Sequence, residues 1–283
     1  MDKKDICIVI PIYKEVLNEF EIQSVVQCIK LLSDYRLYFV CPKGMNTSEY
    51  RCKFKEIVNY VFFNEVYFKG IKGYNKLMLN PEFYKTFTDY DYMLIYQTDC
   101  YVFRDELLHW ANKDFDYIGG LWFDNYIGNP YQGAKVWCAG NGGLSLRKTK
   151  SMIELLSSKK AMKGMPKLFT DAKRLKIFGI LSYFKGILLL PFRFLGYKNN
   201  FSYRAKTFAE NEDAYFVEAG LVYKKIKIPK VEDAMFFSWD RHPEYLFNTI
   251  EKLPFCCHAW YRDDSLYKEN KKFWLNQLKK NEI

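Results

Sequence analysis

Apolar residues recur in short runs along the first half of the chain, and amphipathic stretches separate these runs. Residues 6–12 form a continuous, β-branched run, which is typical of a strand buried on both faces of a parallel sheet. Similar runs predict further strands at residues 36–41, 60–63, 92–96 and 117–121. Helical spacing of apolar positions predicts helices at residues 21–32, 75–87 and 104–112. This alternation predicts an α/β fold with a mostly parallel central sheet and helices on both faces.

The second half of the chain has a less regular pattern. A short strand is expected at residues 144–147, then a helix at 149–156, with further strands at 221–228 and 234–239. A Lys-rich helix is expected at residues 267–280. We therefore expect one domain over residues 1–262, interrupted by an insertion over residues 159–206 and followed by a C-terminal helical segment over residues 263–283.

Positive charge is concentrated in the insertion at residues 159–206. The whole chain has a net charge of +10, and this segment contains twelve basic residues and a single acid, Asp171. Its apolar part, residues 177–191, is interrupted by Lys185, two glycines and Pro191, which argues against a membrane-spanning helix. We expect a basic amphipathic helical insertion that binds an anionic membrane surface. The alternative is a solvated lid or a contact between protein copies.

The cysteines and the first residues of the chain bear on its compartment. None of the eight cysteines forms a C-x-x-C pair, so we expect neither a structural zinc site nor a thioredoxin-type site. Several lie in apolar runs, and we expect all eight to be reduced. The first residues carry no apolar leader, and no run of about 18 apolar residues occurs. We therefore expect a cytoplasmic protein that is peripheral at the inner face of the cell membrane.

The strand at residues 92–96 is followed by Gln97, Thr98 and Asp99. Ligands of open α/β sheets bind beyond the carboxyl ends of the strands, so an acid at this position is a candidate site residue. A single carboxylate suits Mg²⁺ or Mn²⁺ when phosphate oxygens of a substrate supply the other ligands. The alternative for Asp99 is a structural acid that caps the next turn.

Two further segments contain candidate chemistry. Glu212 and Asp213 follow Glu210 and precede an apolar stretch. Either acid is a candidate general base for a substrate hydroxyl, and the alternative is that both stabilise a helix N-terminus through its dipole. His258 is one of three histidines and lies in an apolar, aromatic setting, where it is either a metal ligand or a core histidine.

Seven motifs, taken in order, resemble those of a bacterial family of predicted glycosyltransferases that was formerly known only as a domain of unknown function. That family is similar to glycosyltransferases of the A fold, so the resemblance implies a Rossmann-like catalytic domain of this type from about residue 6 to residue 262, without the insertion. The motifs are VIPIYK (9–14), GYNKLM (73–78), LIYQTD (94–99), DYIGGLW (116–122), GNGGLSLR (140–147), NED (211–213) and CHAW (257–260).

The resemblance implies a binding site for a nucleotide-sugar donor. Pro11, Ile12 and Tyr13 would hold the nucleotide base, and Trp122 would shape the sugar pocket. Residues 140–143 would form a loop in which glycine lets the backbone approach the donor sugar closely. The residues implied in donor binding are Pro11, Ile12, Tyr13, Lys14, Tyr74, Asn75, Gln97, Thr98, Trp122, Gly140, Asn141, Gly142 and Gly143.

The resemblance also implies a divalent cation, Mn²⁺ or Mg²⁺. Asp99 matches the last acid of the family's D-x-D metal motif, and His258 matches its C-terminal histidine. Gln97 replaces the first acid of the motif and adds no charge to the metal site, although its amide is able to bind a ribose. Glu212 or Asp213 matches the acid that serves as the base in inverting members.

The implied function is metal-assisted transfer of a sugar from a nucleoside-diphosphate sugar, by default UDP-linked, to a hydroxyl. The acceptor would be a glycan or a lipid-linked glycan in bacterial surface polysaccharide synthesis, and the mechanism would be inverting. A nucleotidyltransferase of related fold is the competing enzyme class, but residues 11–15 lack the expected Gly-rich basic loop. Two non-enzymatic functions also compete: that of an inactive relative acting as a scaffold, and that of a basic membrane- or nucleic-acid-binding protein. Because no nucleic-acid-binding module is present, we expect no nucleic-acid partner.

Overall fold

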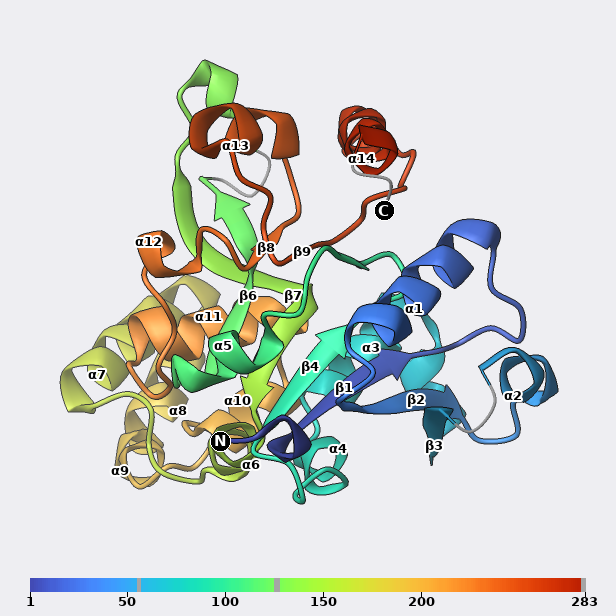
Figure 1. Ribbon diagram of the computed structural model, residues 1–283. Helices are drawn as coiled ribbons and strands as arrows, with labels where there is room; N and C mark the ends of the chain where they lie inside the picture. Colours follow the sequence, from blue (N-terminus) through green and yellow to red (C-terminus); the bar gives the residue numbers. More distant parts are fainter. Residues whose placement is uncertain (55–56, 125–127, 281–283) are drawn as a thin grey trace.

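A six-stranded sheet forms the centre of the molecule in the computed structural model, which describes residues 1–54, 57–124 and 128–280 (Figure 1). The strand order is β3-β2-β1-β4-β7-β6. Four strands are mutually parallel: β1 (Ile6–Pro11), β2 (Arg36–Pro42), β3 (Val58–Phe63) and β4 (Tyr92–Tyr96). The long strand β7 (Val136–Lys148) runs antiparallel to both β4 and β6 (Tyr117–Phe123). The expectation of a mostly parallel α/β sheet is confirmed.

Both faces of the sheet are buried, as the continuous apolar runs predict. In β1, Ile8 and Ile10 point into one core cluster, and Cys7 and Val9 point into the other. The first cluster is covered by α1 (Glu19–Leu31), α2 (Ser48–Phe54), α5 (Leu107–Asn112) and α14 (Lys268–Lys280). The second is covered by α3 (Gly70–Met78), α4 (Pro81–Lys85), α6 (Thr149–Ser157), α10 (Phe201–Lys206) and α11 (Glu212–Val217).

A second, three-stranded sheet was not predicted. It has the order β5-β9-β8, with β5 (Tyr101–Val102), β9 (Cys256–Cys257) and β8 (Ser238–Trp239). Each strand has only two residues, which is too short for a recognisable apolar pattern in the sequence. The connection from β8 to β9 contains α13 (Pro243–Ile250).

One predicted helix and two predicted strands were wrong. The helix expected at residues 75–87 is two helices, because Pro81 starts α4 and the Asn80 side chain caps it. The strand expected at 221–228 is a π-helical turn (Glu218–Val222) followed by irregular chain, in which Ile228 packs against Gly220. Of the strand expected at 234–239, only Ser238–Trp239 is extended, and α12 (Val231–Ala234) precedes it.

The insertion at residues 159–206 is helical. It contains α7 (Met165–Arg174), a short 3-10 helix (Leu175–Phe178), α8 (Ile180–Leu188), α9 (Leu190–Phe194) and α10, and in Figure 1 the first three α-helices lie on the opposite side of the molecule from α1 and α2. No helix in residues 1–54, 57–124 or 128–280 has both the length and the apolar character that crossing a membrane requires. The last residues of the C-terminal segment, 281–283, lie outside the described residues, and α14 accounts for the Lys-rich helix expected before them.

All eight cysteines lie in the described part of the chain, and none of them is in a disulfide there. Seven are buried, and Cys52 in α2 is exposed. The buried thiols pack as small apolar side chains, and burial raises the pKa of Cys138 to about 12.

A fully buried arginine links β7 to α11. The Arg147 guanidinium donates to Glu212 Oε1 at 2.9 Å, to the Tyr84 hydroxyl at 2.8 Å and to Ser145 Oγ at 2.9 Å. It also lies against the Phe216 ring, 5.1 Å from the centroid. Because a buried charge is costly unless it is paired and hydrogen-bonded, this contact fixes the position of α11 on the sheet.

We predict that Arg147→Ala lowers the free energy of unfolding by about 3–5 kcal/mol, because the substitution leaves Glu212 buried without its partner. Urea denaturation measures this loss. Lys148→Ala is the matched control, since the Lys148–Asp114 ion pair is partly exposed and should contribute about 1 kcal/mol or less. Equal effects of the two substitutions would contradict the assigned role of Arg147.

Candidate functional site

A cavity of about 350 Å³ opens at the carboxyl ends of β1 and β4, where open α/β sheets bind their ligands. Its volume lies within the range of small-molecule sites. Of the predicted site residues, it is lined by Pro11, Tyr13, Tyr74, Gln97, Thr98 and Asp99. The remaining lining residues were not predicted from the sequence, and they are Glu21, Tyr67, Phe68, Gly70, Ile71 and Tyr261. Five of the twelve lining residues are aromatic, which suits a planar ring.

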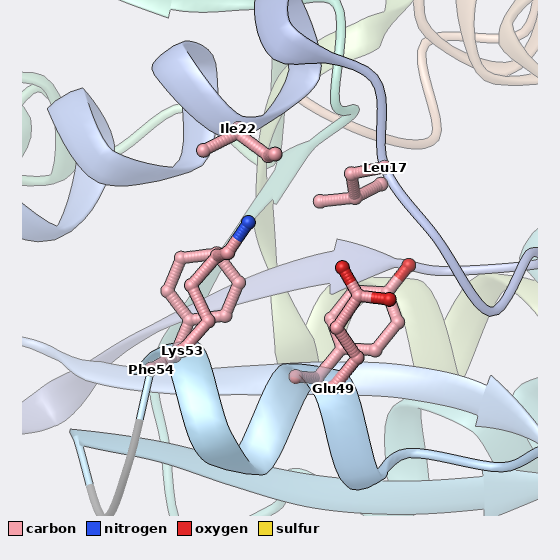
Figure 2. A pocket seen from close by; sticks show the side chains of 6 residues that line it. Leu17, Ile22, Glu49, Lys53 and Phe54 are labelled. Atoms are coloured by element: carbon pink, nitrogen blue, oxygen red, sulfur yellow. The ribbon is translucent and has the colours of Figure 1, made fainter.

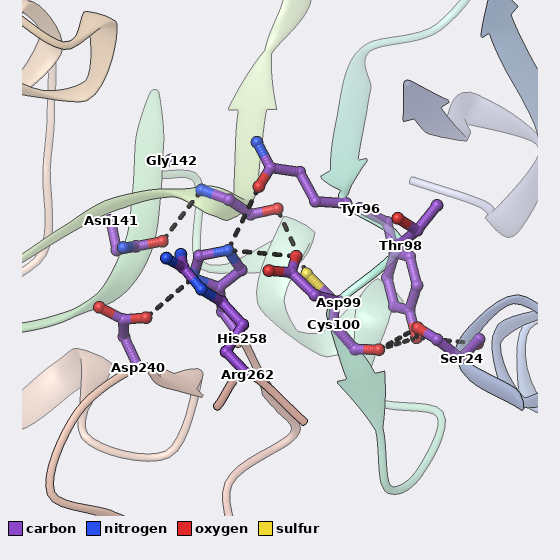
Figure 3. Close-up of polar contacts among 12 residues, drawn as sticks. Ser24, Tyr96, Thr98, Asp99, Cys100, Asn141, Gly142, Asp240, His258 and Arg262 are labelled. Atoms are coloured by element: carbon purple, nitrogen blue, oxygen red, sulfur yellow. Dashed lines mark hydrogen bonds and ion pairs between the residues drawn. The ribbon is translucent and has the colours of Figure 1, made fainter. Parts of the chain in front are cut away.

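Asp99 lines this cavity, and its side chain lies beside that of His258 (Figure 3). Asp99 Oδ1 is 3.3 Å from His258 Nε2, although 159 positions separate the two residues in the sequence. The amide oxygen of Gln97 is 3.2 Å from the same ring nitrogen. The structure therefore brings together the two predicted metal ligands, with the residue that departs from the family motif beside them.

The opposite edge of the imidazole contacts a carboxylate that was not predicted from the sequence. His258 Nδ1 is 2.8 Å from Asp240 Oδ1, and the Asp240 side chain is fully buried. Two groups at the start of α14 hold Asp240 in turn: the Tyr267 hydroxyl lies 3.2 Å from Asp240 Oδ2, and Asn270 Nδ2 donates to the Asp240 carbonyl at 3.0 Å. A carboxylate on one ring nitrogen fixes the orientation of the ring and leaves the other nitrogen for a ligand.

The three-stranded sheet explains why these residues meet. In its register, Cys257 lies opposite both Tyr101 and Trp239. His258 directly follows Cys257, and Asp240 directly follows Trp239. Asp99 precedes Tyr101 by two residues, and its carbonyl accepts from the Trp260 amide at 3.2 Å. Three short strands thus place three distant segments side by side.

The two carboxylates determine the charge of the imidazole. Burial lowers the pKa of His258, but Asp99 and Asp240 raise it more, to about 10. Burial raises the pKa of Asp99, whereas His258 and then Arg262 lower it, and the net result is below the ordinary value. Asp99 and Asp240 therefore favour the protonated form of the His258 ring in the free site, and a cation that binds at Nε2 must displace the proton there.

The donor set at this edge fits a divalent cation whose remaining ligands come from a substrate. Asp99 Oδ1, His258 Nε2 and the Gln97 amide oxygen converge, and carboxylate, imidazole and amide groups are all ligands of Mn²⁺. Among the described residues, no group of three or more His, Cys, Asp or Glu side chains is placed to hold a metal ion. The donors brought together at this edge are one carboxylate, one imidazole and one amide oxygen.

Glu21 forms part of the cavity floor. Its buried carboxylate pairs with Lys14 Nζ at 2.7 Å and accepts from Thr98 Oγ1 at 3.2 Å. Its other oxygen accepts from the Asn18 amide at the start of α1. From the sequence, Asn18 and Glu21 would be identified only as a capping box, so no signal marked Glu21 as a site residue. Lys14, predicted for the donor, is oriented by this pair.

Several predicted donor-site residues lie outside the cavity lining. Ile12 is buried in the core beside β1, and Asn75 caps α11, with its amide oxygen 3.3 Å from the Glu212 amide nitrogen. Trp122 is buried and stacks on Trp137 with 6.2 Å between ring centroids. Their roles in donor binding stay predictions.

Residues 140–143 belong to strand β7, so the expectation that they form a loop was wrong. The pairing with β6 jumps from Gly119–Ser145 to Gly120–Asn141, which leaves a bulge at residues 142–144. The glycines make room for neighbouring side chains: a Cβ on Gly143 would collide with the His258 ring, and one on Gly142 would collide with Glu212. The Asn141 side chain accepts from the Gly143 amide at 2.9 Å and stabilises the bulge.

Asp213 and Glu212 start α11 but differ in their surroundings. Glu212 is buried against Arg147. Asp213 is only partly buried and accepts hydrogen bonds from the Gly142 amide at 3.1 Å and the Ala214 amide at 2.8 Å. Burial, followed by the nearby Glu212 charge, raises the pKa of Asp213 to about 7. Of the two acids, Asp213 is the one with the properties of a base near neutral pH.

Two other cavities lie near this site. The pocket between α1 and α2 in Figure 2, lined by Leu17, Ile22, Glu49 and neighbouring side chains, holds only about 10 Å³, which is the space of a single water molecule. The other, of about 530 Å³, shares Tyr67 with the first cavity and is lined by Lys72, Lys76 and Lys206. Of these two, only the larger has the size of a further ligand site.

Several solved structures are similar to this chain at low sequence identity, and all three described here are glycosyltransferases. The apo form of the glycosyltransferase GlyE of Streptococcus pneumoniae TIGR4 matches 98% of this chain at 11% identity and a TM-score of 0.45. This chain spans 63% of the length of GlyE. The galactosyltransferase LgtC, in complex with donor and acceptor sugar analogues, matches at 12% identity and a TM-score of 0.48, with 95% of each chain covered. Apo mouse xyloside xylosyltransferase 1 matches 89% of this chain and is covered to 96%, at 8% identity and a TM-score of 0.45.

None of the curated proteins matches the chain in sequence. The family model described as "Protein of unknown function (DUF5672)" matches residues 57–258, which is more than half of the chain and includes Asp99, Asp240 and His258. The chain therefore belongs to this family.

Proposed function

We propose that this protein is a glycosyltransferase that moves a sugar from a nucleoside-diphosphate sugar to an acceptor hydroxyl. The observation that carries the proposal is the pairing of Asp99 with His258 at the edge of an aromatic cavity beyond β1 and β4. A cavity of aromatic rings suits a nucleobase, and an adjacent cation site suits a diphosphate. Uridine diphosphate is the proposed carrier.

Different residues of the chain would bind the base, the ribose and the diphosphate of the donor. Tyr13, Tyr74 and Tyr261 surround the base, while Gln97 and Thr98 offer hydrogen bonds to the ribose. Asp99 and His258, with the Gln97 amide oxygen, would hold Mn²⁺ or Mg²⁺ against the diphosphate. When bound, the cation offsets the negative charge that develops on the leaving diphosphate.

Asp213 is the proposed general base for the acceptor hydroxyl. Its carboxylate contacts the Gly142 amide, and the next residue, Gly143, faces the His258 ring, so only the bulge of β7 separates the base from the cation site. A base on the acceptor side implies direct displacement and inversion at the sugar carbon. The proposed acceptor is a glycan or lipid-linked glycan of a bacterial surface polysaccharide.

The donor is tested by thermal shift with nucleoside diphosphates and their sugars, each with and without Mn²⁺. A ligand at about 100 times its Kd stabilises the native state by about 2.7 kcal/mol, which raises the melting temperature by roughly 5 °C in a chain of this size. We expect the largest shift with UDP or a UDP-sugar plus Mn²⁺. Asp99→Asn should remove the part of the shift that depends on Mn²⁺.

Asp89→Asn is the matched control for this experiment, because Asp89 is exposed and lies outside the cavity lining. It should keep the full shift. If no nucleotide raises the melting temperature, or if Mn²⁺ stabilises Asp99→Asn as it stabilises the wild type, the donor site proposed here is wrong.

The raised pKa of Asp213 predicts the pH dependence of sugar transfer. The base must be ionised, so kcat should fall about tenfold per pH unit below about 7, and Asp213→Asn should lower kcat by roughly 10²–10⁴. Initial-rate measurements between pH 5 and 9 give both results. A rate that does not change between pH 5.5 and 7 would exclude Asp213 as the base.

A stability measurement checks the same pKa without activity. Because the folded pKa of Asp213 lies above the unfolded value, its protonated form favours folding, and this contribution is lost as pH rises from about 4 to about 7. Asp213→Asn carries no charge at any pH. It should therefore raise the melting temperature more at pH 8 than at pH 5.

Asp240 is a positioning residue whose loss should weaken cation binding. Asp240→Asn removes the carboxylate that orients His258, and the Mn²⁺ concentration for half-maximal thermal shift in the presence of UDP should rise 10- to 100-fold. Tyr267→Phe, which removes one hydrogen bond to Asp240, should give a smaller increase. The shift by UDP without Mn²⁺ should stay unchanged, and its loss would indicate a purely structural role.

A further inference from the structure

The insertion exposes large apolar side chains in an unusual concentration. Six of them define what we call the apolar face: Ile177, Phe178, Leu181, Leu188, Phe192 and Leu195. Each is at least 58% exposed, and Ile177 reaches 84%. They come from the 3-10 helix, α8, α9 and the residue after α9, which are neighbours in the fold. Exposed large apolar side chains that gather on neighbouring elements in this way indicate an interaction site.

The orientation of α8 explains the exposure. Its buried side is formed by Gly186, where a Cβ would collide with the Leu175 side chain, and by Ile187, which packs against Leu168 and Ala172 of α7. The side of α8 that contains Gly186 and Ile187 therefore packs against the insertion, and Leu181 and Leu188 face outward. In a globular protein the large apolar side chains of a helix normally face the core. The insertion has its own small core, separate from the two main clusters.

The surroundings of the apolar face are strongly basic. Residues 159–206 contain twelve basic side chains and one acid. Two ion pairs are formed, Lys163 with Asp171 and Arg204 with Glu218, and within the described chain the other ten basic side chains have no ion-pair partner. Most of the positive charge of the insertion is therefore free for an external partner.

A basic cavity adjoins the apolar face. It holds about 250 Å³, and its charged lining residues are Lys163, Arg193, Lys198, Arg204 and the acid Glu218. Arg204 is paired with Glu218 and Lys163 with Asp171, which leaves Arg193 and Lys198 as the bases without an ion-pair partner among these lining residues. Arg193 of α9 lines the cavity and Phe192 of the same helix belongs to the apolar face, so both features include α9. Basic side chains beside exposed apolar side chains match the two parts of a phospholipid. The bases would bind the headgroup phosphate, and the apolar side chains would contact the acyl chains.

We propose that the insertion docks this protein on the surface of an anionic phospholipid bilayer. The side chains of the apolar face enter the interfacial region, and Arg193 and Lys198 bind headgroup phosphates in the basic cavity. A second copy of the chain does not fit as the occupant, because a symmetric contact would press two surfaces of the same strong positive charge together. This docking does not depend on the proposed donor chemistry.

Flotation of the whole protein with vesicles tests the proposal. The wild type should float with phosphatidylcholine vesicles that contain phosphatidylglycerol and should stay behind with pure phosphatidylcholine. The apolar variant, Ile177→Ser/Leu181→Ser/Leu188→Ser, should lose at least a factor of about 10 in partitioning. Arg193→Gln/Lys198→Gln should lose a factor of roughly 25, since each basic side chain near an anionic leaflet strengthens binding about fivefold.

Two controls make the result specific. Lys30→Gln/Lys53→Gln removes the same charge from exposed positions in α1 and α2, on the other side of the molecule, and should float like the wild type. Each variant should keep the wild-type melting temperature, because the substituted side chains are exposed or half-buried.

Three results would overturn the proposal. The first is a wild type that does not float with anionic vesicles. The second is an apolar variant that floats as well as the wild type. The third is a wild-type dimer by light scattering that the apolar variant converts to a monomer without loss of flotation, which would assign the apolar face to a second copy.

Discussion

The pairing of one buried imidazole with two carboxylates is the interaction on which the candidate site depends. His258 lies between Asp99 at the edge of the cavity and Asp240 in the interior, at 3.3 and 2.8 Å. Three backbone features make this arrangement possible: the register of the β5-β9-β8 sheet, the absence of a side chain at Gly143, and the hold of α14 on Asp240. Buried charges are tolerated only when their partners are held in place, so the position of these three charged side chains depends on a sheet whose strands have only two residues each.

The sequence predicted those parts of the fold in which the apolar residues form a clear pattern along the chain. The strands of the parallel sheet are buried on both faces and read as unbroken apolar runs, so β1 and β4 were found within a residue of their bounds. The strands of the second sheet have two residues each, which is too short for an apolar pattern. In the segment at residues 221–228, the apolar residues do not share one buried face. In both segments the secondary structure depends on contacts with residues far away in the chain, and a single sequence does not reveal these contacts.

The candidate site divides in a similar way. Asp99 and His258 were identified because each stands out in its own segment and matches a family motif, and the structure places them in contact. Asp240 and Glu21 were missed because their neighbours in sequence mark an ordinary turn and a helix cap, while their partners come from remote elements. The family resemblance implied a loop at residues 140–143, in which glycine would let the backbone approach a donor sugar, but here Gly143 provides space for the imidazole and Gly142 for Glu212.

The burial of the cysteines has a practical consequence for following this protein in solution. Seven thiols lie in the interior, where reagents do not reach them, and Cys52 alone among the eight is exposed. It sits in α2, beyond the edge of the parallel sheet and across the molecule from α7–α9 (Figure 1). A maleimide dye would therefore attach to the wild-type chain at one position without any engineered cysteine, and its distance from a fluorescent lipid would report how the molecule is oriented.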